Sequence, residues 1–217
     1  AECWAGKSLP APAELAAGDD GDAWWHFCVL YPSLLAAEAT DAPGPGASIG
    51  AERDPCAARH DASARASAVD WLSSAHELVG LGPASLFLAV RLLDGLLRPG
   101  PAPVGRLTLL SASALFVAAK FEESPPPSPD LLVQAGAGGF TVAELKEAEA
   151  AALRRLDFRL HRPTAAHHLA WFQPLGGPAS SSSLREPLAQ YLCELGLACA
   201  EAPSWPPSLH AAAAVLL

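Results

Sequence analysis

Two short stretches of the sequence bring together side chains that could do chemistry. AAHHLAWFQ places His167 next to His168, and AAKFEESPPP places Lys120 beside an aromatic residue and two glutamates. Imidazoles bind metal ions, but adjacent residues on a helix point about 100° apart, so this pair cannot hold one ion as residues four apart would. The chain also has no P-loop or Rossmann glycine pattern. We therefore expect a protein that is not an enzyme and that uses no metal, cofactor or small-molecule substrate.

Charge and cysteine content restrict the partners and the compartment. The formal net charge is −9, and no run of basic residues is interleaved with aromatic ones, so a nucleic-acid partner is disfavoured. The apolar stretch 107–119 is too short to cross a bilayer, which disfavours a membrane partner. Five cysteines without a CxxC motif predict free thiols in a reducing compartment, the nucleus or the cytoplasm.

The elements that must position these side chains are predicted to be helices. Apolar residues make up 51% of the chain, and most are alanine or leucine, which favour helix over sheet. They recur every three or four residues in five stretches between residues 64 and 165, and glycine and proline separate the stretches. Thr141 and Glu144 predict a capping box at the start of the fifth helix.

The remainder of the chain is predicted to be less regular at its start than at its end. We expect residues 1–63 to be irregular and partly disordered, with Trp24 and Trp25 docked onto some surface. Residues 166–217 predict a linker and further helices. The chain has no methionine and ends at AAAAVLL, in the middle of an apolar helical pattern, as a fragment would.

Four stretches together resemble the cyclin box. They are, in order, RASAVDWL, LFLAVRLLD, LTLLSASALFVAAKFEESPPP and AELKEAEAAALRRLDFRLHRPT. YLCELGLACAEAPSWPPSLHAAAAVLL resembles the start of the second cyclin fold. The resemblance implies an all-α fold, in which a five-helix cyclin box over residues 64–165 is followed by the first helices of a second, incomplete one. It also implies a regulatory subunit that binds and activates a cyclin-dependent protein kinase in the cell cycle or a related process.

The resemblance assigns roles to individual residues. Arg65 and Asp94 match a buried ion pair that ties the first helix of the box to the second, and Lys120 and Glu149 match two residues that bind the mobile regulatory helix of the kinase. The expected apolar contacts on the same surface are Phe121, Val117, Leu153 and Leu160. Leu109 and Trp71 match framework positions, and Trp71 could serve either the core or a partner.

Several departures from the family pattern limit what can be expected. Many cyclins dock substrates on an apolar patch of the first helix, but here its positions hold Ala64, Ser67 and Ala68, so little apolar area is available. With these departures, the sequence resembles a divergent or orphan cyclin. The alternative function is a cyclin-fold interaction scaffold that does not activate a kinase. Taken alone, Lys120 could be no more than a solvated residue at the end of a helix.

Overall fold

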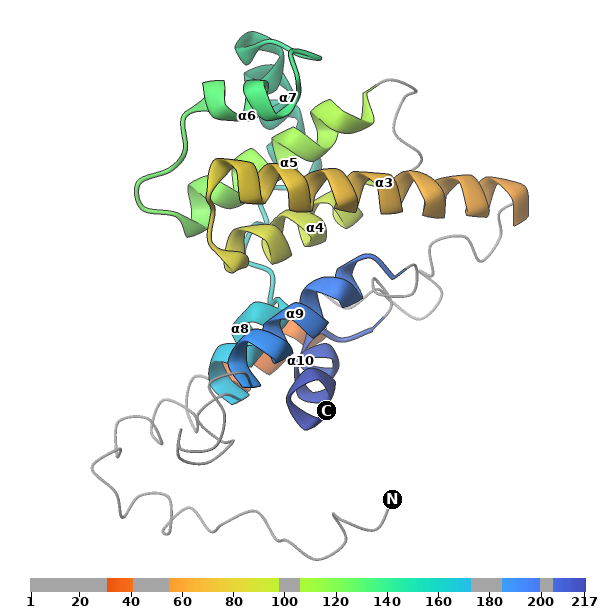
Figure 1. Ribbon diagram of the computed structural model, residues 1–217, viewed down its shortest axis with the longest axis vertical. Coiled ribbons are helices and arrows are strands. Elements are labelled where there is room, and N and C mark those ends of the chain that lie inside the picture. The colour runs from red at the N-terminus through yellow and green to blue at the C-terminus, as the bar shows by residue number, and fades with distance from the viewer. Residues whose placement is uncertain (1–30, 41–54, 98–105, 173–184, 200–204) are drawn as a thin grey trace, which may run out of the picture.

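The computed structural model of the protein describes residues 31–40, 55–97, 106–172, 185–199 and 205–217. All regular secondary structure within these ranges is helical. The helices are 31–40, α3 (Pro55–Val79), α4 (Pro83–Leu97), α5 (Leu107–Glu122), α6 (Pro129–Ala135), α7 (Val142–Arg155), α8 (Ala165–Phe172), α9 (Arg185–Leu197) and α10 (Pro207–Leu216). In Figure 1, α3 to α7 form one group, and α8, α9 and α10 form a second group together with helix 31–40.

Helix α5 is the centre of the first group, where it contacts α3, α4, α6 and α7. Every residue from Ser111 to Ala119 is buried. Small side chains make this possible, because alanine and serine let neighbouring helices approach from all sides. The hydroxyls of Ser111 and Ser113 donate to the carbonyls of Leu107 and Leu110, so no polar group is left unpaired by this burial.

Helix ends follow the signals expected from the sequence. The Thr141 hydroxyl accepts from the Glu144 amide, and the Glu144 carboxylate accepts from the Thr141 amide at 2.8 Å, which confirms the predicted capping box. Ser128 caps α6 in the same way by accepting from the Asp130 amide. Between α3 and α4, Gly80 has φ +74°, a backbone conformation that glycine adopts without strain.

The prediction that residues 1–63 are irregular is wrong in two places. Residues 31–40 form a helix, and α3 begins at Pro55, before the predicted boundary. Proline is favourable at the first position of a helix, and the alanine-rich run after it has high helix propensity, although it contains few large apolar side chains to mark a buried face. Trp24 and Trp25 lie outside the described residues, as do residues 41–54.

Two further features of the described residues are the state of the cysteines and the length of the apolar helices. Cys193 and Cys199 are free thiols, and burial raises the pKa of Cys193 to about 11, so this thiol stays protonated and packs as a small apolar group. None of the helices in the described ranges combines the length and the apolar character that crossing a membrane would need.

Candidate partner-binding surface

Arg65 and Asp94 form a buried ion pair between α3 and α4. The Arg65 Nε lies 2.7 Å from Asp94 Oδ1, and its second terminal nitrogen donates to Oδ2 at 3.1 Å. Both side chains are 7% exposed. A planar guanidinium matches both oxygens of a carboxylate at once, which fixes the angle between the two groups as well as the distance.

The same arginine also reaches the second group of helices. Its remaining terminal nitrogen donates to the carbonyl oxygens of Leu197 and Cys199, at 2.9 and 3.1 Å. These carbonyls lie at the end of α9, where the last carbonyls of a helix have no partner within the helix. Arg65 therefore joins α3, α4 and α9, and holds the two helix groups together.

Lys120 and Glu149 are joined across α5 and α7. The Lys120 Nζ donates to Glu149 Oε1 at 2.7 Å and also lies 4.1 Å from the centre of the Phe116 ring. The lysine side chain is 43% exposed and the glutamate side chain 15%. Lys120 lies in the last turn of α5, whereas Glu149 lies in the middle of α7. The pair is thus oriented by packing between the two helices rather than by two helix ends.

The predicted apolar contacts around this pair differ in exposure. Phe121 is 49% exposed, and Leu153 and Leu160 are partly buried against the core. Val117, also expected as an apolar contact, is only 3% exposed and so offers a partner almost no contact area. The helical spacing gives α5 one buried face, whereas its small residues let it be buried all round. Leu109 and Trp71 are partly buried against the same core.

Phe158 is an exposed aromatic residue that the sequence did not single out. Its side chain is 67% exposed, and it lies in the turn between α7 and Leu160. Asp157 and Phe158 both have positive φ, +51° and +56°, which is unusual for residues other than glycine. The Phe158 amide donates to the Leu153 carbonyl at the end of α7, so the turn is fixed and the ring is held outward. The only sequence signal was an aromatic residue directly after a helix.

Glu123 explains part of the charge cluster that follows Lys120. Its Oε1 accepts from the Gly82 amide at 2.7 Å and from the buried Ser85 hydroxyl at 2.6 Å. Gly82 and Ser85 flank the start of α4, so the carboxylate caps this helix from the end of α5.

We expect Glu123→Ala to lower the free energy of unfolding by about 1–3 kcal/mol, because it leaves the buried Ser85 hydroxyl without an acceptor. Urea unfolding followed by circular dichroism would measure this loss. Glu147→Ala, which removes an exposed carboxylate from α7, is the matched control and should change stability by less than about 0.5 kcal/mol. Equal stability of the two variants would contradict the capping role.

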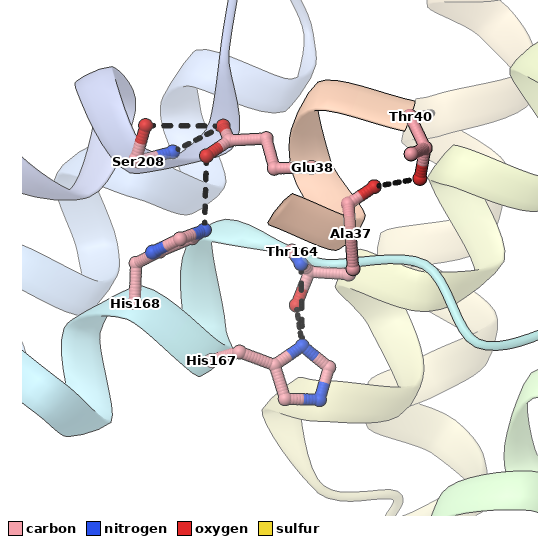
Figure 2. A network of polar contacts seen from close by, with 7 residues as sticks. All are labelled: Ala37, Glu38, Thr40, Thr164, His167, His168 and Ser208. Carbon is pink, nitrogen blue, oxygen red and sulfur yellow. Dashed lines mark hydrogen bonds and ion pairs between the residues drawn. The ribbon is translucent and has the colours of Figure 1, made fainter. Parts of the chain in front are cut away.

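The adjacent histidines of α8 have different partners (Figure 2). His167 Nδ1 accepts from the Thr164 amide and lies 2.8 Å from the Thr164 hydroxyl, while Nε2 lies 3.9 Å from Glu122. His168 is fully buried and faces Glu38 instead. No cluster of three potential metal ligands occurs within the described ranges. The letters GASIG over residues 46–50 fit the GxSxG pattern of hydrolases, but this segment lies outside the described residues.

The sequence profile of the family described as "Cyclin, N-terminal domain" matches residues 51–161. The chain belongs to the cyclin family. This match covers α3 to α7, the helices that carry both ion pairs. The predicted membership of the family is therefore confirmed.

Individual cyclins also match this one. It is 35% identical over 153 residues to a G2/mitotic-specific cyclin-B2 of Anguilla japonica, covering 70% of this chain and 38% of that protein. It is 34% identical over 148 residues to the G2/mitotic-specific cyclin cdc13 of Schizosaccharomyces pombe, covering 68% and 30%. The chain thus spans well under half of the length of these relatives. Both of these relatives are G2/mitotic-specific cyclins.

Solved structures share the fold of this cyclin. A viral cyclin from Herpesvirus saimiri superposes with a TM-score of 0.72 at 19% identity, covering 85% of this chain and 79% of that chain. A chain of the yeast RNA polymerase II CTD kinase CTDK-1 complex gives a TM-score of 0.60 at 13% identity, covering 84% and 58%. These matches confirm the predicted all-α cyclin fold.

Proposed function

We propose that this cyclin is a regulatory subunit that binds a cyclin-dependent protein kinase through the surface around Lys120 and Glu149 and activates it. The observation that carries the proposal is the ion pair itself, which is set between partly exposed apolar residues of α5 and α7. Membership of the cyclin family supports it. The free thiols fit action in a reducing compartment, and we assign the protein to the nucleus or the cytoplasm on that basis.

The geometry of the pair suits recognition of backbone groups on a partner helix. An ammonium group has three donors, of which one is used by Glu149. The others can donate to partner carbonyls, while the carboxylate can accept from partner amides. Because each charge holds the other in place, little side-chain freedom is left to be lost on binding. The apolar neighbours supply contact area and the charges fix the register of the partner.

Phe121 and Phe158 supply the largest exposed apolar side chains next to the expected contact positions. Phe121 directly follows Lys120, and Phe158 lies between Leu153 and Leu160 in the sequence. Aromatic side chains often dominate the binding energy of interfaces. In this proposal they anchor the kinase helix. Activation is then a shift in population, because the surface binds the active arrangement of the kinase better than the inactive one.

A cyclin-fold interaction scaffold that does not activate a kinase is the second candidate. It is favoured by the weak substrate-docking patch of α3, where Ala68 is buried and Ser67 offers no apolar area. The ion pair of Lys120 and Glu149 favours the regulatory subunit instead. The two candidates differ in whether a kinase is activated.

A pull-down from cell lysate tests both candidates. We expect the wild-type chain to retain a kinase, identified by mass spectrometry, and the double variant Lys120→Ala/Glu149→Ala to lose it. The control is Lys146→Ala/Glu147→Ala, which removes the same two charges from exposed positions on α7 and should retain the kinase. All three proteins should have equal helicity by circular dichroism.

The activity of the retained kinase separates the outcomes. Binding with activation supports the regulatory subunit, and binding without activation supports the scaffold. Equal retention by the wild type and by the Lys120/Glu149 variant would move the binding site to another surface. No kinase retained by a folded wild-type chain would contradict the regulatory subunit and favour the scaffold.

A further inference from the structure

Helix 31–40 is seated on the second helix group, far from its own position in the sequence (Figures 1 and 2). Glu38 is only 7% exposed, and its Oε1 accepts from the Ser208 amide at 2.9 Å and from the Ser208 hydroxyl at 3.1 Å. Ser208 lies in the first turn of α10, where amides have no partner within the helix. The carboxylate of Glu38 therefore caps α10 at the positive end of its dipole.

The other oxygen of Glu38 faces a buried imidazole. His168 Nε2 lies 3.5 Å from Glu38 Oε2, and the His168 side chain is 0% exposed. Neither ring nitrogen of His168 has a hydrogen-bond partner among the described residues. Tyr31, two turns before Glu38, packs edge-on against the His168 ring, with 5.8 Å between ring centres, and also contacts the ring of Phe172. Helix 31–40 is thus held at both of its ends by α8 and α10.

We propose that helix 31–40 is a clasp that closes over α8 and α10 at neutral pH and opens when the solution is acidified, with the buried His168 as the sensor. Burial disfavours the charged form of an imidazole whose ring nitrogens make no hydrogen bond to the described residues, even with the Glu38 carboxylate 3.5 Å away. Charging it favours the open position of the clasp, in which water can solvate the ring. This proposal does not depend on the kinase-binding surface, which lies on α5 and α7.

The charged groups around His168 determine the direction of the effect. Burial lowers the pKa of His168 more than the carboxylate of Glu38 raises it, and His167 on the same helix lowers it further. Tyr31 of helix 31–40 faces the ring directly. Ser208 of α10 acts on the ring only indirectly, because it is hydrogen-bonded to Glu38. On α10, burial and then the charge of Arg91 from α4 lower the pKa of His210, so this second imidazole also resists protonation.

The sign of the pH dependence follows from these shifts. In the open clasp His168 is solvated and titrates near its ordinary pKa of about 6.5, whereas in the closed clasp its pKa is lower. The open form therefore takes up the proton first as the pH falls below about 6.5. The equilibrium constant for closing should fall by up to about tenfold per pH unit, until the closed form is protonated as well.

Hydrogen–deuterium exchange of the whole 217-residue chain, read by mass spectrometry between pH 5 and 8, tests the clasp. Rates are corrected for the intrinsic pH dependence of exchange, and peptides from α4 serve as an internal reference. We expect the amides of residues 31–40 to lose protection as the pH falls from 7.5 to 5.5. In Glu38→Ala, which has lost the cap, we expect these amides to be unprotected at every pH.

Two variants at position 168 isolate the sensor. His168→Leu fits among the rings of Tyr31 and Phe172 and cannot titrate, so the clasp should stay closed from pH 5 to 8. His168→Gln tests the same point if the leucine variant does not fold. Loss of the pH dependence in either variant supports the proposal. An unchanged pH profile in a folded His168 variant, or full protection of residues 31–40 in Glu38→Ala, would overturn it.

Discussion

Replacing Arg65 with methionine should lower the free energy of unfolding by about 3–5 kcal/mol, the cost of leaving one partner of a buried ion pair uncompensated. Methionine keeps most of the length of the side chain, so the effect reports lost charge and hydrogen bonds rather than an empty cavity. Asp94 would stay buried without its cation, and the carbonyls of Leu197 and Cys199 would lose their donor. Urea unfolding followed by circular dichroism measures the change.

Two further variants separate the parts of this effect. Arg159→Met changes an exposed arginine and should change the stability by less than about 0.5 kcal/mol. Arg65→Lys keeps the charge but lacks the planar set of donors of a guanidinium. Its free energy of unfolding should therefore lie between those of the wild type and the methionine variant. A loss of under about 1 kcal/mol for Arg65→Met would mean that the pair contributes little to holding α3, α4 and α9 together.

Exchanging the charges of Lys120 and Glu149 should abolish most of the kinase binding while leaving the fold nearly as stable. Lys120→Glu/Glu149→Lys keeps an ion pair between α5 and α7. It places a carboxylate opposite the partner carbonyls and an ammonium group opposite the partner amides. We expect a loss of about 2–5 kcal/mol in binding free energy, roughly 30-fold or more in Kd, because charges of the wrong sign would be desolvated at the interface. Titration calorimetry with the kinase found in the pull-down measures it.

Stability is the necessary companion measurement for this charge exchange. The exchange removes the contact between the Lys120 ammonium and the Phe116 ring, which at an exposed site is worth about 0.5–1 kcal/mol, so the stability should fall by no more than this. Lys146→Glu/Glu147→Lys on the exposed side of α7 is the matched control for net charge and should bind as the wild type does. If the exchanged and wild-type chains bind the kinase equally well, the pair serves only the packing of α5 against α7.

The sequence predicted the local features of the fold well and the distant contacts poorly. The helices of the cyclin box follow from a spacing of three to four residues, and the cap at Thr141 follows from residue types three positions apart. The contact of Arg65 with α9 could not be predicted in this way, because it joins residues 132 positions apart. The resemblance to cyclins suggested the partner Asp94 but not the carbonyls of Leu197 and Cys199.

The differences at Val117 and at helix 31–40 have one physical cause, because local sequence patterns hold little information about tertiary packing. The resemblance to cyclins places an apolar contact at Val117, but α5 is rich in alanine and serine and is buried all round, which leaves this side chain only 3% exposed. Helix 31–40 was missed because Glu38 indicates a solvated position. The amide and the hydroxyl of Ser208, far along the chain, both donate to that carboxylate and make its burial favourable.

The capping of α10 by Glu38 has a consequence for the order in which the chain is assembled. Glu38 and Ser208 are 170 residues apart. At a synthesis rate of 5–20 residues per second, the ribosome therefore makes helix 31–40 roughly 10–30 s before it makes the start of α10, against which Glu38 packs. Until α8 has been made Tyr31 lacks its partners, and until α10 has been made Glu38 lacks Ser208, while α3 to α7 can already pack together. Helix 31–40 is therefore made before α3 to α7 but reaches its native position only after α10 has been made.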